Sequence, residues 1–208
     1  EYCGVLLDKV TNGIIDDIVV PAGTPVGVYT EGWVSDMVIK NSTFTNDICL
    51  RLENSNHVSV SNCSITSSAS LYPGVRLIDS NYIDLSNLSV KNGMAGILAV
   101  ESHHTTIKDC DVFSNYFGID FIASRYAVLR NNTIYDNIYG FHMGSLVSFD
   151  DYIHDIDTSN TIDGKPMYYL RSASDLVFDG SEDIGFLGFI ECGNITVKNF
   201  NMSNSGNA

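Results

Sequence analysis

The chain is poor in positively charged side chains. Its 11 Lys and Arg residues stand against 25 Asp and Glu residues, which gives a formal net charge of −14 at pH 7. Nucleic acids and anionic membranes are bound through cationic surfaces, so this composition argues against both as partners. It suits an extracellular, cell-surface protein, or one whose surface carboxylates bind divalent cations such as calcium.

Other common signals are missing as well. No apolar run approaches the roughly 18 residues of a membrane span, so direct membrane insertion is not expected. No stretch combines a helical hydrophobic period with capping residues. The chain has no Cys-x-x-Cys or His-x-x-x-His spacing, no glycine-rich phosphate loop and no serine nucleophile elbow. We therefore expect no bound cofactor and no transition-metal site.

The cysteines form no evident disulfide framework. There are five, an odd number, so at least one thiol lacks a partner within the chain. One interpretation is that they are free and buried. The other is an intermolecular disulfide through Cys3 or Cys49.

Against these absences stands a repeat of about 22 residues. Apolar anchors recur with steps of 24, 21, 25, 22, 22 and 24 residues, and a final gap of 44 spans two periods. The anchors are Ile15, Ile39, Val60, Leu85, Ile107, Leu129, Ile153 and Val197. Two residues after each anchor stands an Asn or Asp, in the order Asp17, Asn41, Asn62, Asn87, Asp109, Asn131, Asp155 and Asn199. Such a period predicts a solenoid, in which each turn buries its apolar face by stacking on the next.

Within one repeat, apolar residues alternate with polar ones in three short runs. In the clearest copy the runs are 74–77, 83–85 and 88–90, with Ser80 and Asn87 between them. Period-two alternation punctuated by Ser, Asn and Gly predicts strands and turns. We therefore expect an all-β fold, a single-stranded parallel β-helix of about nine coils that forms one domain over the whole chain.

The Asn and Asp column marks one corner of each coil. An Asn side chain tolerates left-handed backbone and can bond the Asn of the next coil, so the column should form a ladder. Ten residues before the anchors we expect an inward core column that includes Tyr29, Leu50 and Val75. Four Asn-x-Ser/Thr sequons fall on the corner column and are expected to be buried there, namely Asn41, Asn62, Asn87 and Asn131.

Between Ile153 and Val197 the repeat is less clear. We place one coil there, with Tyr168 and Leu170 in its first strand and Phe178 as its anchor. Neither end of the sequence shows a polar cap. The domain therefore reads as a slice of a longer protein, or as a subunit that stacks end to end on copies of itself.

An outward column of rings lies three residues before the anchors. It consists of His57, Tyr82, His104 and Tyr126, followed by Asp150. Rings stacked at sheet spacing and ending in a carboxylate predict a strip that can contact sugar rings and bond their hydroxyls. The structural alternative is that such stacking merely stabilises the sheet.

A second group of candidates comprises Arg76, Asp79, Glu101 and Asp120. Glycosidases use two carboxylates that flank the scissile bond, and these residues could supply them. The alternative is that a chain with 25 acidic residues places carboxylates side by side by accident. We favour this alternative and assign no catalytic residue.

The motif of Gly, Ile and Phe in 118–121, followed by Asn and Ile in 131–134, resembles the repeats of the NosD-like and pectate-lyase-like right-handed β-helix family. The run 160–170 resembles segments of archaeal, especially methanogen, cell-surface proteins. The resemblance implies a right-handed coil. The family includes sugar-binding modules, envelope proteins, polysaccharide hydrolases and lyases, and its lyases use carboxylates for calcium and a basic residue as proton acceptor. No catalytic motif of the family matches this chain residue by residue.

These observations predict a non-catalytic, extracellular structural or adhesive module of the cell envelope, of the surface-layer, sheath or filament type. Its expected partners are other copies of itself or neighbouring envelope proteins, with polysaccharide as a further candidate. The alternative is a polysaccharide lyase or glycoside hydrolase domain.

Overall fold

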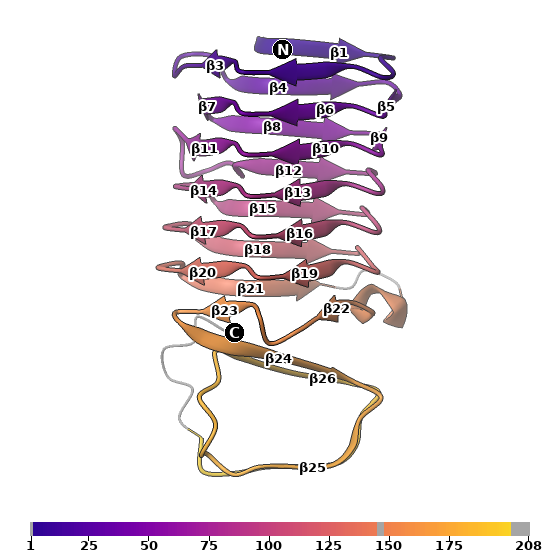
Figure 1. Ribbon diagram of the computed structural model, residues 1–208, viewed down its shortest axis with the longest axis vertical. Helices are drawn as coiled ribbons and strands as arrows, with labels where there is room; N and C mark the ends of the chain where they lie inside the picture. Colours follow the sequence, from indigo (N-terminus) through magenta and orange to yellow (C-terminus); the bar gives the residue numbers. More distant parts are fainter. Residues whose placement is uncertain (1, 145–147, 201–208) are drawn as a thin grey trace.

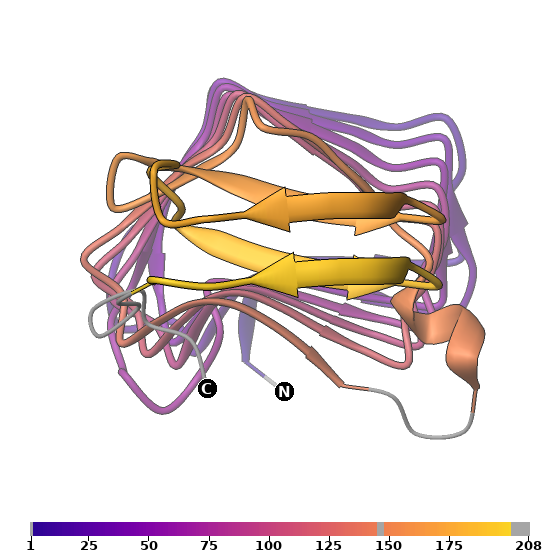
Figure 2. The ribbon, with the colours of Figure 1, turned by 90° about the horizontal axis from the view of Figure 1, so that it is seen from below.

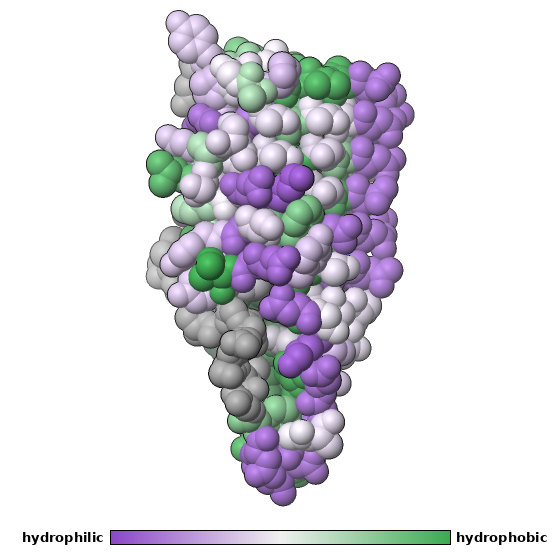
Figure 3. Space-filling view, turned by 90° about the vertical axis from the view of Figure 1, so that its left-hand side faces the viewer, coloured by the Kyte–Doolittle hydropathy of each residue, from purple (hydrophilic) through white to green (hydrophobic). Residues whose placement is uncertain are grey.

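The computed structural model describes residues 2–144 and 148–200. It shows an all-β, right-handed parallel solenoid of about nine turns, drawn out into a rod (Figure 1). Each of the first seven turns contributes one strand to each of three sheets, which form the faces of the rod. On the face that carries the third sheet, hydrophilic residues form a band along one edge of the rod (Figure 3). Such a band arises when residues of the same kind stack on successive turns.

The strands of the first sheet are, in spatial order, β1 (Cys3–Asp8), β4 (Val26–Glu31), β8 (Ile48–Glu53), β12 (Val75–Ile78), β15 (Ala95–Val100), β18 (Phe117–Ile122) and β21 (Tyr139–Gly144). Those of the second are β2 (Ile14–Asp16), β6 (Val38–Lys40), β10 (Ser59–Ser61), β13 (Asp84–Ser86), β16 (Thr106–Lys108), β19 (Val128–Arg130) and β22 (Asp155–Ile156). Those of the third begin with β3 (Val19–Val20), β7 (Thr43–Asn46), β11 (Ser64–Ser67), β14 (Ser89–Lys91), β17 (Asp111–Phe113), β20 (Thr133–Tyr135) and β23 (Thr161–Ile162).

The third sheet continues into the last turns through β24 (Lys165–Arg171) and β26 (Phe186–Ile190). Two smaller pairs are β5 (Val34–Ser35) with β9 (Ser55–Asn56), and β25 (Ser174–Phe178) with β27 (Gly193–Val197). A short 3-10 helix, η1 (Phe149–Tyr152), precedes β22. In the part of the chain that the structure describes, no helix has the length and apolar character of a membrane span.

The turns stack in register. Leu50 pairs with Val75, Val75 with Ile97, and Ile97 with Ile119, and all four side chains are fully buried. Each such burial contributes about 1.5–3 kcal/mol. The predicted core column is therefore confirmed at these positions.

The same column departs from prediction in the seventh turn, where Phe141 and not Met143 pairs with Ile119, and in the second turn. Val28, not Tyr29, pairs with Leu50, and Tyr29 pairs with the outward Arg51. Val28 is fully buried. The segment between β4 and Ile39 is one residue longer than its equivalent in the next turn, so counting back from the anchor selects the wrong residue.

The corner column forms a hydrogen-bonded ladder. The side-chain amide of Asn87 donates to Oδ1 of Asn62 (2.7 Å), and Asn62 donates to Asn41 (3.2 Å). Asn131 donates in the same way to Asp109 (3.0 Å). All five residues have φ between 51° and 58°, the left-handed region that Asn and Asp tolerate best. The predicted ladder is confirmed for these residues.

The ladder side chains lie outside the solenoid. Asn41, Asn62, Asn87 and Asn131 are all exposed, so the expectation that their sequons are buried is wrong. A left-handed residue at a bend turns its side chain away from the core that the flanking strands enclose.

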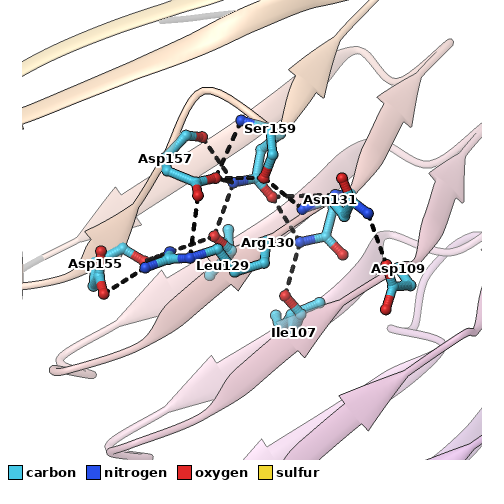
Figure 4. Close-up of polar contacts among 10 residues, drawn as sticks. Ile107, Asp109, Leu129, Arg130, Asn131, Asp155, Asp157 and Ser159 are labelled. Carbon is cyan, nitrogen blue, oxygen red and sulfur yellow. Dashed lines mark hydrogen bonds and ion pairs between the residues drawn. The ribbon is translucent and has the colours of Figure 1, made fainter.

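The anchor and ladder columns depart from prediction in the seventh turn, where Asp155 contacts Arg130 while Asn131 contacts Asp109 (Figure 4). Leu129 pairs with Ile156, not with Ile153, because η1 and the residues around it lengthen this turn. Asp155 therefore lies in β22, where its Oδ2 is 2.6 Å from Nη2 of Arg130. The assignment of Asp155 to the ladder is wrong.

Beyond the seventh turn the chain reverses, because β23 and β24 pair antiparallel. The pair β24 and β26 then crosses the end of the stack, with β25 and β27 alongside (Figure 2). Met167 and Tyr169 of β24 are buried, and Phe186 of β26 meets Phe141 edge to face at 5.3 Å. Apolar side chains of the last turns thus cover the core of the first seven.

In the last two turns the predicted anchor pair is confirmed, but the predicted corner residue, Asn199, is not. Phe178 pairs with Val197. The side-chain amide of Asn199 donates to the backbone carbonyl of Asp179 (3.2 Å), not to a ladder side chain. Because β25 and β27 form a separate sheet, Asn199 is not part of the ladder.

A second ladder lies inside the solenoid, at the bend between the first and second sheets. Oγ of Ser80 accepts the backbone N–H of Ser55 (3.1 Å), and Oγ of Ser102 accepts that of Ser80 (3.1 Å). Ser124 accepts from Ser102 in turn (3.0 Å), and all four serines are buried. The hydroxyls satisfy backbone groups that would otherwise be buried without partners.

This ladder yields a stability prediction. Ser80→Ala leaves the buried N–H of Ser55 without an acceptor, so we expect the free energy of unfolding to fall by about 1–3 kcal/mol in urea denaturation. Ser86→Ala is the matched control, since Ser86 lies half-buried on the same turn; it should change stability by about 0.5 kcal/mol or less. Equal losses in the two variants would contradict the role of the serine ladder.

Candidate functional site

Four aromatic side chains on consecutive turns form a continuous stack, which we call the aromatic ladder: His57, Tyr82, His104 and Tyr126. Their ring centroids are separated by 4.9, 4.7 and 5.1 Å in this order. The first two pairs are nearly parallel, at 3° and 2°, and the third is tilted by 26°. The separation is the spacing of paired strands, so the backbone register sets the ring stack.

The backbone at the aromatic ladder is unusual for aromatic residues. All four members have φ between 53° and 59°, in the left-handed region that bulky side chains rarely adopt. Asn12 and Asp36 hold the equivalent bend in the first two turns, with φ of 56° and 55°. Rings have thus replaced, on four successive turns, the residue types that this bend accepts at least cost. Left-handed backbone recurs at other bends of the solenoid, so it is the ring at this bend that sets these four turns apart.

Asp150 does not continue the aromatic ladder. The backbone N–H of Tyr126 donates to the carbonyl of Ile153 (2.6 Å), so the segment that adjoins Tyr126 in the next turn is at Ile153 and not at Asp150. Asp150 lies in η1, where its Oδ2 is 3.8 Å from Nη1 of Arg125. The lengthened seventh turn again explains why the prediction fails. The residue that pairs with Leu129 is Ile156 and not Ile153, so a position counted back from Ile153 is wrong by three residues.

Shallow hollows lie on both sides of the aromatic ladder. One, of about 410 Å³, is lined by the four rings together with Asp84, Thr106 and Val128 among others. The other, of about 450 Å³, is lined by three of the rings and by Asn81, His103 and Arg125. The rings therefore form a ridge between two hollows.

A further hollow, which we call the charged pocket, adjoins the second one. It has a volume of about 390 Å³ and is lined by Asp79, Asn81, Glu101, His103, Ala123, Arg125 and Asp151. Asp79 and Glu101 are exposed on neighbouring bends, whereas the side chain of Asp151 is fully buried. Asn81, His103 and Arg125 line both hollows, so the charged pocket and the aromatic ladder share one surface.

Hydrogen bonds hold the polar groups of the charged pocket in place. The backbone N–H of His103 donates to Oδ1 of Asn81 (3.0 Å), and that of Arg125 donates to Nδ1 of His103 (3.3 Å). Nη2 of Arg125 lies 3.6 Å from Oδ1 of Asp151. Burial and then the nearby guanidinium of Arg125 lower the pKa of His103, which favours the neutral ring.

The four catalytic candidates do not converge. Asp79 and Glu101 line the charged pocket, but Arg76 and Asp120 lie on the outer face of the first sheet. Oδ1 of Asp120 is 2.7 Å from Nδ1 of His142 on the next strand. Burial raises the pKa of Asp120, and the bond to His142 opposes this.

In residues 2–144 and 148–200, no three His, Cys, Asp or Glu side chains are grouped so that they could hold a metal ion. The five cysteines carry no disulfide, and Cys49, Cys63 and Cys110 are buried. Burial raises the pKa of Cys49 and of Cys110 to about 11, so neither thiol is reactive near neutral pH.

Comparison with known proteins assigns the chain to a family. Residues 26–156 match the family described as right handed beta helix region, and the chain belongs to it. No curated protein sequence matches the chain.

Solved structures with a related chain path include two groups. Tailspike protein 2 of Escherichia coli O157:H7 bacteriophage CAB120 is 15% identical at a TM-score of 0.48, with 86% of this chain and 32% of the tailspike covered. The A-modules of the Azotobacter vinelandii mannuronan C-5 epimerases AlgE6 and AlgE4 are 12% and 11% identical, at TM-scores of 0.45 and 0.41. These matches cover 92% and 93% of this chain, and 65% and 63% of the epimerase modules. The chain thus spans about a third of the tailspike and less than two thirds of each epimerase module.

Of the five titratable residues of the charged pocket, sequence reasoning missed three as site candidates. His103 and Arg125 stand four residues before their anchors, directly before members of the aromatic ladder, so reading that neighbouring column would have found both. Asp151 could not be found this way. It stands five residues before Ile156, just as Ser124 stands five residues before Leu129. The two positions are recognised as equivalent only once Ile156, and not Ile153, is known to pair with Leu129.

A buried histidine beside the charged pocket makes folding stability depend on pH. His154 stacks on Phe121 at 5.1 Å and accepts the backbone N–H of Ala127 at Nδ1 (3.2 Å). Burial lowers its pKa from 6.5 to about 4, against a smaller opposing effect of Asp151. Between these two values the unfolded chain binds a proton that the folded chain does not, so this residue makes the protein less stable as the pH falls.

We therefore expect His154→Gln to lose less stability than the unaltered protein between pH 7 and pH 5. From pH 7 to pH 5, the free energy of unfolding of the variant should fall by about 2 kcal/mol less than that of the unaltered protein. Urea denaturation at both pH values measures this. His57→Gln, which alters an exposed histidine, serves as control and should follow the unaltered protein. If His154→Gln followed it too, the assignment of a neutral, buried imidazole would be wrong.

Proposed function

We propose that this chain is a non-catalytic, extracellular module of a cell envelope that binds polysaccharide along the aromatic ladder and adheres to neighbouring surface material. The observation that carries the proposal is the uninterrupted stack of four rings at 4.7–5.1 Å on consecutive turns. The proposed partners are a polysaccharide, other copies of the chain and neighbouring envelope proteins. The resemblance of the sequence to archaeal surface proteins supports the envelope location.

The chemistry of the aromatic ladder suits a hydroxylated polymer. Its rings stack face to face along the rod, so they present their edges to the solvent. Tyrosine offers a hydroxyl and histidine its ring nitrogens, and both types donate and accept hydrogen bonds as sugar hydroxyls do. A polymer that lies along the rod meets phenol and imidazole groups in alternation, at the spacing of the turns. The hollows on either side provide room for its rings.

Charge narrows the class of polysaccharide. Asp84 lines one hollow beside the aromatic ladder, and Asp79 and Glu101 line the charged pocket. The guanidinium of Arg125, which could attract an anion, lies within ion-pair distance of Asp151. An acidic polymer would therefore bring carboxylates towards like charges, on a chain whose net charge is −14. We infer a neutral polysaccharide or one that carries amino groups.

The alternative is a polysaccharide lyase or glycoside hydrolase, for which Asp79 and Glu101 are the carboxylates that share a pocket. A general acid is commonly kept protonated by apolar surroundings, but both of these side chains are exposed. Arg76 and Asp120 lie on a different face. This separation favours binding without catalysis.

Removal of the two phenol rings tests the proposal. We expect Tyr82→Ala combined with Tyr126→Ala to weaken binding to neutral or amino polysaccharides about 10-fold or more, since each ring contributes roughly 1 kcal/mol through contact and hydrogen bonding. A glycan array identifies the polymer, and isothermal titration calorimetry measures the change in Kd.

The control for this experiment is Tyr116→Ala. Tyr116 is 48% exposed, comparable to Tyr82 at 49%, but it lies after β17, away from the aromatic ladder. The control should bind as the unaltered protein does, and all variants should keep its circular dichroism spectrum. Undiminished binding by the double variant would refute the aromatic ladder as the polysaccharide site.

The charge argument makes a separate prediction. Asp79→Asn with Glu101→Gln should strengthen binding of an acidic polysaccharide relative to a neutral one, and the gain should shrink as salt rises. Affinity electrophoresis with pectate and with a neutral glucan at two ionic strengths measures both effects. Release of sugar fragments by the unaltered protein, abolished in Asp79→Asn, would instead establish the enzymatic alternative.

A further inference from the structure

A hollow of about 480 Å³ lies at the start of β8 and β12, at the opposite edge of the first sheet from the aromatic ladder. Two arginines line it, Arg51 and Arg76, together with Asp47 and the ring of Tyr72. The chain has only 11 Lys and Arg residues in all, and two of them stand beside this one hollow.

The two arginines stand side by side. Arg51 of β8 and Arg76 of β12 are register partners on adjacent parallel strands, which places their backbones about 4.8 Å apart. Like charges at this distance destabilise a sheet unless something neutralises them. The arrangement therefore favours an acidic group beside each guanidinium.

Arg51 has its acidic group within the protein. Its Nε lies 2.7 Å from Oε1 of Glu53 on the same strand. Its guanidinium also lies over the ring of Tyr29, 4.6 Å from the centroid. These contacts fix the Arg51 side chain and neutralise its charge.

Arg76 lacks such a group. Its Nε is shielded from solvent and has no hydrogen-bond partner in the described part of the chain. Its neighbours in register are Arg51 on one side and the apolar Leu98 on the other, so neither register partner offers an acceptor. A buried donor without a partner is rare in native proteins, and an ordered water or a bound ion is one of its explanations.

The surroundings of Arg76 define the class of ligand. A planar guanidinium binds a carboxylate through two parallel hydrogen bonds. Tyr72, 45% exposed in the loop before β12, offers an apolar surface to the body that carries this group. Asp47 stands on the rim, held by a hydrogen bond from Ser68 (2.8 Å), and opposes a second negative charge.

We propose that Arg76 and Tyr72 form a binding site for a carboxylate carried on a ring-shaped or apolar body, a monoanion of the sugar-acid type. Arg76 holds the carboxylate, Tyr72 contacts the body, and Arg51 with Glu53 provides a rigid, neutral floor. The site does not depend on the aromatic ladder, which follows the other ends of the same strands.

Titration with glucuronate tests this site. The Nε–H resonance of Arg76, followed by ¹⁵N NMR at pH 7, should shift with saturation, because this donor gains an acceptor. Glucose, which lacks the carboxylate, should cause no such shift. Absence of a saturable shift with glucuronate, or an equal shift with glucose, would overturn the proposal.

Variants and simpler anions separate the parts of the site. Arg76→Gln should weaken glucuronate binding at least 10-fold, and Tyr72→Ala should weaken it several-fold. Arg171→Gln, at an exposed arginine of β24, is the control and should leave it unchanged. Unchanged binding in Arg76→Gln would overturn the assignment of the arginine. Because the resonance of Arg76 is read in the unaltered protein, the test stands even if that variant fails to fold.

Two further probes test the ligand class. Acetate should bind more weakly than glucuronate, since it has no body for Tyr72 to contact; equal binding would refute the role of the ring. Inorganic phosphate, largely a dianion at pH 7.5, should also bind more weakly, and tighter binding would refute the selectivity for a monoanion. Tyr82→Ala with Tyr126→Ala should leave glucuronate binding unchanged, which keeps this site distinguishable from the polysaccharide site.

Discussion

Pairing between equivalent residues of successive turns is the constraint on which the rest of this structure depends. Leu50, Val75 and Ile97 share a column because their strands pair in register, and the same pairing stacks the corner asparagines and the buried serines. Each side chain therefore meets the side chain at its own position one turn away. If one turn favours an apolar, amide or hydroxyl side chain at a given position, the neighbouring turns favour the same kind of side chain there. The sequence repeats for this reason.

Because the turns repeat, a side chain type that recurs at one position forms a continuous row on the surface. The bend that carries Asn12 and Asp36 in the first turns carries rings in the next four, at a left-handed backbone that aromatic residues adopt at a cost. Stability alone favours Asn or Asp at such a bend. A row of phenol and imidazole groups at fixed spacing is what the rings add, and this is the physical basis for assigning them a role in binding.

Individual chemistry arises where the repetition is broken. The lengthened seventh turn inserts η1, ends the corner and aromatic ladders, and brings the buried Asp151 against Arg125 and close to His154. In the first sheet, Arg51 and Arg76 share an outward column with the apolar Leu6 and Leu98, and they place two guanidinium groups beside one hollow of an acidic chain.

The sequence by itself determined the class of fold, the period, the core column at Leu50, Val75 and Ile97, and the stacking of His57, Tyr82, His104 and Tyr126, because all of these follow from counting along a regular repeat. Only the tertiary structure decided the places of Asp150 and Asp155, and the reversal of the chain at β24. Counting from an anchor fails once a turn changes length, since the register of later residues is then set by strand pairing and not by their distance along the chain. Whether Arg76 has a partner was likewise a matter of neighbours in space, which no period in the sequence records.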